Sequence, residues 1–378
     1  MTTLTKIMLI LAIASAATSR SRGQSEAKPA PHVRSAIDGV LELFEKTPIV
    51  VLCDHHGLAQ EEAFFSSLVR DPRFAETIGN VVVEFGGESS QSVIDRYVAG
   101  EDVPMNQLRR VWTETPGWVP GPTRLGYINF FANVRAANVA LPAERRLKIW
   151  LGEPKIDWSK INSFQDFEPF IDKRDDNYIR IIGDEILKKH KKALLIIGTG
   201  HIFGDTALFR AKFDQAYPNT LATVAAFAGY RESDCNKRFL ARAKDWPVPA
   251  VVGPVAGTWL KFLLQLPGCN FLPADMIANM KATPAGQLPP GVSSAEELLQ
   301  RVVSMASGDE ADAILYLGPP DTLTESPFDP AIYLDSDYFK EEDRRMRCCT
   351  PPHLGGKLDW DRILQQNTVV PRKLQSVF

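Results

Sequence analysis

The chain has 378 residues, of which 44% are hydrophobic and 24% are charged, a composition that fits one large globular domain or two small ones. Its formal net charge of −3, with Lys and Arg dispersed, excludes the basic footprint of a nucleic-acid-binding protein. The five cysteines are too few and too scattered for a disulfide scaffold, and none has the C-x-x-C spacing of zinc or redox motifs.

The first residues are typical of an export signal. Lys6 gives a positive start, residues 7–17 form a short apolar core, and Ala14-Ser15-Ala16 offers a small-x-small cleavage site. We therefore predict a signal peptide and flexible leader over residues 1–24, and a secreted or periplasmic mature chain; the alternative is a membrane-anchored helix. No stable membrane span is expected after cleavage, because no later segment is apolar for long enough. Export would permit a Cys235–Cys269 disulfide, although spacing does not establish connectivity.

Six apolar runs are predicted to be buried strands, and most are separated by segments of helical periodicity. The strands are expected at residues 49–53, 80–85, 147–151, 193–198, 222–227 and 313–317, and the helices at residues 60–69, 90–99 and 177–189. Alternating strands and helices predict an α/β fold, a mixed, mostly parallel central sheet flanked by helices, in a single domain over residues 33–378.

Two segments rich in Pro and Gly interrupt this rhythm, at residues 112–126 and 271–294. We expect a helical or loop insertion that covers the carboxyl-terminal edge of the strands, since long ordered loops of this kind often serve as lids. Simple connection is the alternative. From residue 325 onward the sequence is polar and contains proline, and it predicts an irregular C-terminal tail.

Four segments place polar side chains where strands end or helices begin, and open α/β sheets gather their ligands at such edges. They are Asp54-His55-His56-Gly57, Glu84 after three valines, Gly198-Thr199-Gly200-His201, and Lys173-Arg174-Asp175. A solvated turn, a helix-capping glutamate, a structural histidine and helix-start electrostatics are the respective alternatives. The glycine spacing G-x-G-x-x-x-G does not fit a dinucleotide site, and there is no G-x-S-x-G, H-E-x-x-H, P-loop or EF-hand motif.

In order and placement, these segments resemble the motifs of the erythromycin esterase-like, ChaN-like and Tiki/TraB superfamily. That pattern runs strand–G-E-x-H-G, strand–E, R-D-x-x-M-A, strand–G-x-x-H. The matching positions are Asp54 and His56, then Glu84, then Arg174-Asp175, then Gly198 and His201. The chain departs from the pattern with Cys53 for glycine, Asp54 for glutamate, and Asn177-Tyr178 for Met-Ala. The superfamily includes esterases, peptidases and haem-binding proteins, so the resemblance leaves the activity open.

The first hypothesis is an exported hydrolase, esterase or metallopeptidase-like, that cleaves an ester or amide in a small-molecule or peptide substrate. His56, polarised by Glu84 or Asp54, would take a proton from water. His201 would orient that water or protonate the leaving group, and Arg174 would stabilise negative charge on the tetrahedral intermediate.

Three other interpretations stay open. Asp54, His56, Glu84 and His201 are also ligand types suited to a divalent metal such as zinc or manganese, which would activate the water instead. A haem-binding or small-ligand-binding protein of the ChaN-like type would use a histidine as axial ligand. In a decayed relative, Cys53 and Asp54 would mark lost activity. The sequence predicts no oligomeric state.

Overall fold

The computed structural model describes residues 28–349, except residues 118–122, 204–206, 228–232, 266–268, 270–280, 286–287, 289–290 and 300–309. The predicted signal peptide and most of the segment 271–294 lie outside the described residues. Within the described part of the chain, no helix has both the length and the hydropathy to cross a membrane.

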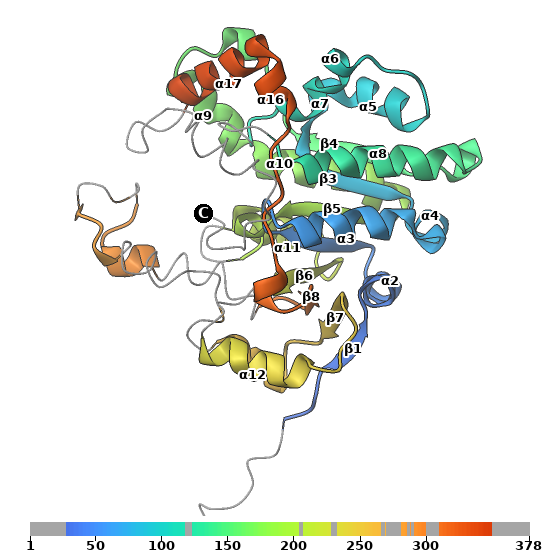
Figure 1. The fold of residues 1–378 in the computed structure, drawn as a ribbon, viewed down its shortest axis with the longest axis vertical. Coiled ribbons are helices and arrows are strands. Elements are labelled where there is room, and N and C mark those ends of the chain that lie inside the picture. Colours follow the sequence, from blue (N-terminus) through green and yellow to red (C-terminus); the bar gives the residue numbers. More distant parts are fainter. Residues whose placement is uncertain are drawn as a thin grey trace, which may run out of the picture.

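One eight-stranded sheet has the strand order β1-β7-β8-β6-β2-β5-β3-β4 (Figure 1). The strands are β1 (His32–Ser35), β2 (Ile49–Asp54), β3 (Asn80–Gly87), β4 (Lys148–Glu153), β5 (Ala193–Gly198), β6 (Leu221–Phe227), β7 (Ala250–Gly253) and β8 (Ala313–Tyr316). Only β7 runs antiparallel to its neighbours, so the predicted mixed, mostly parallel sheet is confirmed. The sequence does not predict β1 and β7, because each has four residues and prolines flank β7.

Helices flank the sheet and surround its carboxyl-terminal edge (Figure 1). They are α2 (Ala36–Lys46), α3 (Ala59–Arg70), α4 (Pro72–Thr77), α5 (Gln91–Val98), α6 (Met105–Leu108), α7 (Arg110–Thr113), α8 (Leu125–Val139), α9 (Phe164–Asp172), α10 (Arg174–Ile181), α11 (Leu208–Ala216), α12 (Asp234–Ala243), α13 (Trp259–Leu264), α16 (Ala331–Leu334) and α17 (Ser336–Cys349).

Successive side chains of a strand point to opposite faces, and both faces of the sheet are covered. Val50 and Leu52 of β2 belong to an apolar cluster with α2, α3, α5 and α8. Val51 and Cys53 belong to a second cluster with α10, α11, α12 and α13. Every residue of β2 is therefore buried, which explains the uninterrupted apolar run in the sequence.

Two sequence expectations need correction. The part of the tail that the structure describes, residues 325–349, is expected from the sequence to be irregular but contains α16 and α17, because α17 places Tyr338, Arg345 and Cys349 on a buried face. The helix predicted over residues 177–189 begins earlier, at Arg174, and continues after Ile181 as a π-helical turn. The Cys235–Cys269 disulfide is present, and Cys348 is bonded to Cys349.

Candidate functional site

The carboxyl ends of β2, β3 and β5 bring three of the predicted side chains together. His56 follows β2, Glu84 lies in β3, and His201 ends the turn after β5. The Nε2 atom of His56 is 3.9 Å from Oε2 of Glu84, and the Nε2 atom of His201 is 3.5 Å from Oε1 of the same carboxylate. Because β5 lies between β2 and β3 in the sheet, residues that are far apart in sequence meet around one carboxylate.

Each of the two histidines is held by an aspartate on its other ring nitrogen. Nδ1 of His56 lies 2.9 Å from Oδ2 of Asp54, and Nδ1 of His201 lies 2.5 Å from Oδ1 of Asp175. A carboxylate on Nδ1 favours a proton there and leaves Nε2 as the reactive nitrogen of the neutral ring. The site therefore contains two Asp–His pairs, and in each pair the Nε2 atom of the histidine faces the Glu84 carboxylate.

Asp54 is itself held by a buried tyrosine. The hydroxyl of Tyr127, in α8, donates to Oδ2 of Asp54 at 2.5 Å. The ring of Tyr127 stacks on Phe85 of β3, with 4.4 Å between centroids, and this stack fixes α8 against the strand that carries Glu84. Since Asp54 is only 1% exposed, the position of its carboxylate is set by protein groups rather than by solvent.

Glu84 is fixed by contacts on both of its oxygens. Its Oε2 accepts a hydrogen bond from the backbone N–H of Gly198 at 2.5 Å, and its Oε1 pairs with Nη2 of Arg174. Arg174 also binds Glu153, from the end of β4, through Nε at 2.8 and 3.0 Å. Tyr178 donates its hydroxyl hydrogen to Glu153. Arg174 thus sits between two buried carboxylates and neutralises much of their charge.

The surroundings raise the basicity of both histidines. Burial lowers the pKa of His56, but the carboxylates of Glu84 and Asp54 outweigh it and leave the pKa above its ordinary value. Burial likewise lowers the pKa of His201, while the hydrogen bonds to Asp175 and Glu84 raise it to about 9. Burial alone would raise the pKa of Glu84, yet His56 and Arg174 hold it well below the usual range. Glu84 is therefore ionised at neutral pH.

Two further acids lie buried in the first turn of α3, behind Asp54. Burial raises the pKa of Glu62 to about 8 and that of Glu61 well above its ordinary value. Oε2 of Glu61 accepts from the backbone N–H of His55. Burial lowers the pKa of His55 to about 4, and its ring lies against Glu61 rather than Glu84. His55 therefore lies beside the other site residues without facing Glu84.

The buried thiol of Cys53 packs in the second apolar cluster, where burial raises its pKa well above the usual value. A thiol that stays protonated is a poor nucleophile, so Cys53 brings no chemistry to the site.

The metal interpretation does not gain support from the geometry. Among the described residues, no three His, Cys, Asp or Glu side chains are arranged so that they could hold a metal ion. The physical reason lies in the four residues that would bind a metal, which are Asp54, His56, Glu84 and His201. Their donor atoms point at one another and at Arg174.

The structure places all five predicted site residues in one network and adds four that the sequence analysis does not assign. The sequence carries a recognisable signal for Glu153, because this residue follows an apolar run at the end of a strand, as Glu84 does. Asp175 stands beside Arg174 in the quoted motif, but its pairing with His201 is visible only in the fold. Tyr127 and Tyr178 have no sequence signal that separates them from core aromatic residues.

No protein-family model matches this chain, and no curated protein matches it. Three solved structures are distantly similar to it. A protein from Bacillus cereus shares 9% identity, with 75% of this chain and 92% of that chain covered at a TM-score of 0.39. The type III effector HopBA1 shares 12% identity, with 54% and 90% covered at a TM-score of 0.35. ChaN of Campylobacter jejuni, solved with cofacial haem, shares 12% identity, with 55% and 94% covered at 0.34. Similarity this distant carries no functional argument, so the case rests on this chain's own geometry.

Proposed function

We propose that this protein is a hydrolase that cleaves an ester or amide through a water molecule activated by His56. The observation that carries the proposal is the pair of Asp-bound imidazoles whose Nε2 atoms lie 3.9 and 3.5 Å from one carboxylate. A neutral His56, protonated on Nδ1, takes a proton from water at Nε2, and the hydroxide attacks the substrate carbonyl. His201 gives its Nε2 proton to the leaving oxygen or nitrogen as the tetrahedral intermediate collapses.

Glu84 and Arg174 supply the electrostatics in this scheme. The ionised Glu84 stabilises the imidazolium that forms when His56 gains a proton. Arg174 keeps Glu84 ionised, and its Nε and Nη2 are occupied by Glu153 and Glu84. Its Nη1 makes no hydrogen bond to the described residues, and this is the donor that we assign to the negative charge of the intermediate.

Haem binding is the second candidate, and the same histidines decide between the two. An axial histidine commonly donates Nδ1–H to a carboxylate, as His56 and His201 are placed to do. An iron atom would bind the same Nε2 atoms that serve as base and acid in the hydrolase, and both of these face Glu84. Titration with haem therefore separates the two candidates. A Soret band on haem titration, lost in the His56 or His201 variant, would support the binding protein instead.

The decisive variant is His56→Ala in the mature protein, assayed on panels of aryl esters and peptides. We expect wild-type activity on at least one substrate and a loss of about 100-fold or more in kcat, because a general base contributes on that order. His32→Ala is the matched control, since His32 is exposed on β1 and contacts none of these residues. Equal activity of the His56 variant would overturn the mechanism, and inactivity of the wild-type protein on every substrate would favour a binding protein or a decayed relative.

Export and family membership belong to the same proposal. The leader sequence of residues 1–24 supports a secreted or periplasmic protein, and the Cys235–Cys269 disulfide is compatible with an oxidising compartment. The convergence of Asp54, His56, Glu84, Arg174 and His201 supports membership of the erythromycin esterase-like, ChaN-like and Tiki/TraB superfamily. The single sheet supports a single domain.

A further inference from the structure

Residues 323–349 pass beside the candidate site and then dock on its flanks, as the orange-to-red ribbon that rises to α16 and α17 in Figure 1. We call this segment the C-terminal strap. It starts at Leu323, which is fully buried in the first apolar cluster, and its last described residue is Cys349.

The first half of the strap contacts the segments that carry His56 and Tyr127. The backbone N–H of Ser326 donates to the carbonyl oxygen of Gly57, the residue after His56, at 2.7 Å. Arg124, three residues before Tyr127, donates from Nη1 to the carbonyl oxygen of Ser326 at 2.8 Å. The Arg124 guanidinium also lies 4.0 Å from the centroid of the Phe328 ring. The strap thus connects the loop after β2 with the start of α8.

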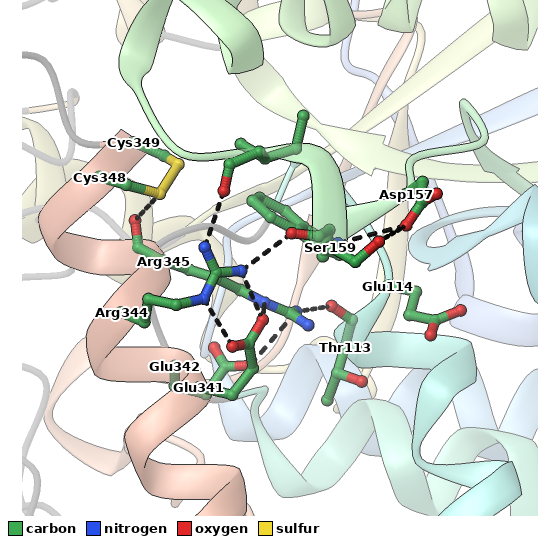
Figure 2. Close-up of polar contacts among 12 residues, drawn as sticks. Thr113, Glu114, Asp157, Ser159, Glu341, Glu342, Arg344, Arg345, Cys348 and Cys349 are labelled. Atoms are coloured by element: carbon green, nitrogen blue, oxygen red, sulfur yellow. Dashed lines mark hydrogen bonds and ion pairs between the residues drawn. A yellow bond between two sulfur atoms is a disulfide. The ribbon is translucent and has the colours of Figure 1, made fainter.

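The second half of the strap, in α17, joins the segment that contains Thr113 to the segment that contains Ser159 (Figure 2). Arg345 donates from Nη1 to the carbonyl oxygen of Thr113, and its guanidinium lies 4.5 Å from the centroid of the Trp158 ring. Arg344 donates to the carbonyl oxygens of Ile161 and Trp158 at 2.7 and 3.0 Å.

Both of these segments lead directly to the site. Gly117 lies a few residues after Thr113 in the same segment. A side chain at Gly117 would collide with the Arg174 guanidinium and with Oε1 of Glu153. Trp158 comes five residues after Glu153, at the end of the connection from β4. A displacement of α17 would therefore release residues 113–117 and 158–161, the two segments that lead to the Arg174–Glu153 pair.

The docking of α17 does not depend on the main core. Its buried apolar contacts form a small separate cluster of Ile156, Trp158, Ile161, Phe167 and Cys349, and α16 contributes to another with Ile332 and Tyr338. Its polar contacts with other segments include the hydrogen bonds of Arg344 and Arg345 to backbone carbonyl oxygens and the ion pair between Arg109 and Asp335, the residue before α17. Segments with few buried apolar contacts open at a lower free energy than the core.

We propose that α16 and α17 form a detachable cover, which opens together with residues 113–117 and 158–161 while the sheet stays folded, and so controls access to the candidate site. The consequence for turnover rests on the proposed hydrolase. The opening itself does not, because it is a property of the fold and is measured without substrate.

Native-state hydrogen exchange with mass spectrometry on the full chain tests this proposal. We expect the amides of residues 336–349, 113–117 and 158–161 to exchange at a common rate, at least about 100-fold faster than those of β2 and β5. Arg344→Ala should accelerate all three segments together by about tenfold, since it removes two hydrogen bonds from a charged donor. Arg347→Ala is the matched control, because the partner of Arg347 among the described residues is Asp343, in α17 itself.

Two outcomes would contradict the proposal that α16 and α17 form a detachable cover. One is α17 exchanging as slowly as β2, which would make it part of the global fold. The other is an Arg344 variant that accelerates α17 alone, or all strands equally. The result is independent of the His56 assay, so failure of the cover and failure of the hydrolase are distinguishable.

Discussion

The two histidines of the site are the same residue type with the same orientation, and their neighbours separate their roles. The His56 side chain is 29% exposed and is held by a buried aspartate, whereas the His201 side chain is 16% exposed and its hydrogen bonds to Asp175 and Glu84 raise its pKa to about 9. The more accessible histidine suits a base that meets water. A histidine that is protonated at neutral pH suits an acid. Environment rather than residue type assigns these roles.

These pKa shifts predict a bell-shaped dependence of kcat/KM on pH. The base His56 must be neutral, so the rate rises as pH passes its raised pKa. The acid His201 must be protonated, so the rate falls as pH passes about 9. We therefore expect an optimum on the alkaline side of neutrality.

Asp175→Asn tests the second limb of this profile. The hydrogen bond that His201 donates to Asp175 raises the pKa of His201, so its loss should move the alkaline limb to lower pH. It should also lower kcat by about 10- to 100-fold through misorientation of the imidazole. The pH dependence of kcat/KM in both proteins is the measurement, and Asp176→Asn is the control, because Asp176 pairs with Lys212 on the surface. An unchanged alkaline limb would show that His201 is not the acid.

At the scale of single elements, the strand ends explain why the site lies where it does. Parallel strands β2, β3, β4 and β5 all end at one edge, and each provides a carboxylate or the turn that leads to a histidine. Gly198 is the last residue of β5 and lies at this edge. A side-chain carbon there would lie 2.7 Å from Nε2 of His56 and 3.2 Å from Oε2 of Glu84. The glycine is required for close approach of its neighbours.

Gly198→Ala should therefore damage the site without unfolding the sheet. The added methyl group displaces the His56 ring, whose side chain is partly exposed. We expect kcat to fall by about tenfold or more, on the scale of a mispositioned catalytic group, while the melting temperature changes by only a few degrees. Circular dichroism melting alongside the activity assay separates the two effects. Full activity at an unchanged melting temperature would contradict the close packing.

At the scale of the whole molecule, two apolar clusters hold one sheet, and the disulfide between Cys235 and Cys269 ties together residues 34 positions apart. Both cysteines are buried in the second cluster. A cross-link stabilises mainly by reducing the freedom of the unfolded chain, and the effect grows slowly with loop length.

Replacing both cysteines with alanine should lower the free energy of unfolding by about 3–4 kcal/mol, the chain-entropy value for a loop of this length. Urea unfolding of the oxidised wild-type protein and the double variant measures the difference. Cys53→Ala serves as the comparison, because it removes a buried thiol of the same cluster that forms no disulfide. Equal midpoints for wild type and double variant would show that the bridge does not stabilise the fold.

The sequence by itself determined the fold class and most of the sheet, because strands buried on both faces leave continuous apolar runs. It also singled out Asp54, His56, Glu84 and His201 as candidates, since polar groups directly after such runs are expensive to bury without a task, and Arg174 as a candidate at a helix start. Neither the short strands β1 and β7 nor the helices α16 and α17 left a comparable pattern in the sequence. Their structure comes from contacts with distant segments, as for Arg345 on Thr113.

Only the tertiary structure decided how these residues pair. The strand order places β5 between β2 and β3, so that two histidines from different loops reach one glutamate. It also gave each histidine its own aspartate and placed Tyr127 and Glu153 in the network. The physical reason is that pairing depends on distances of a few ångströms between groups that lie far apart in the chain, such as Gly198 and Glu84, which are 114 positions apart. Local sequence patterns carry no information about separations of that kind.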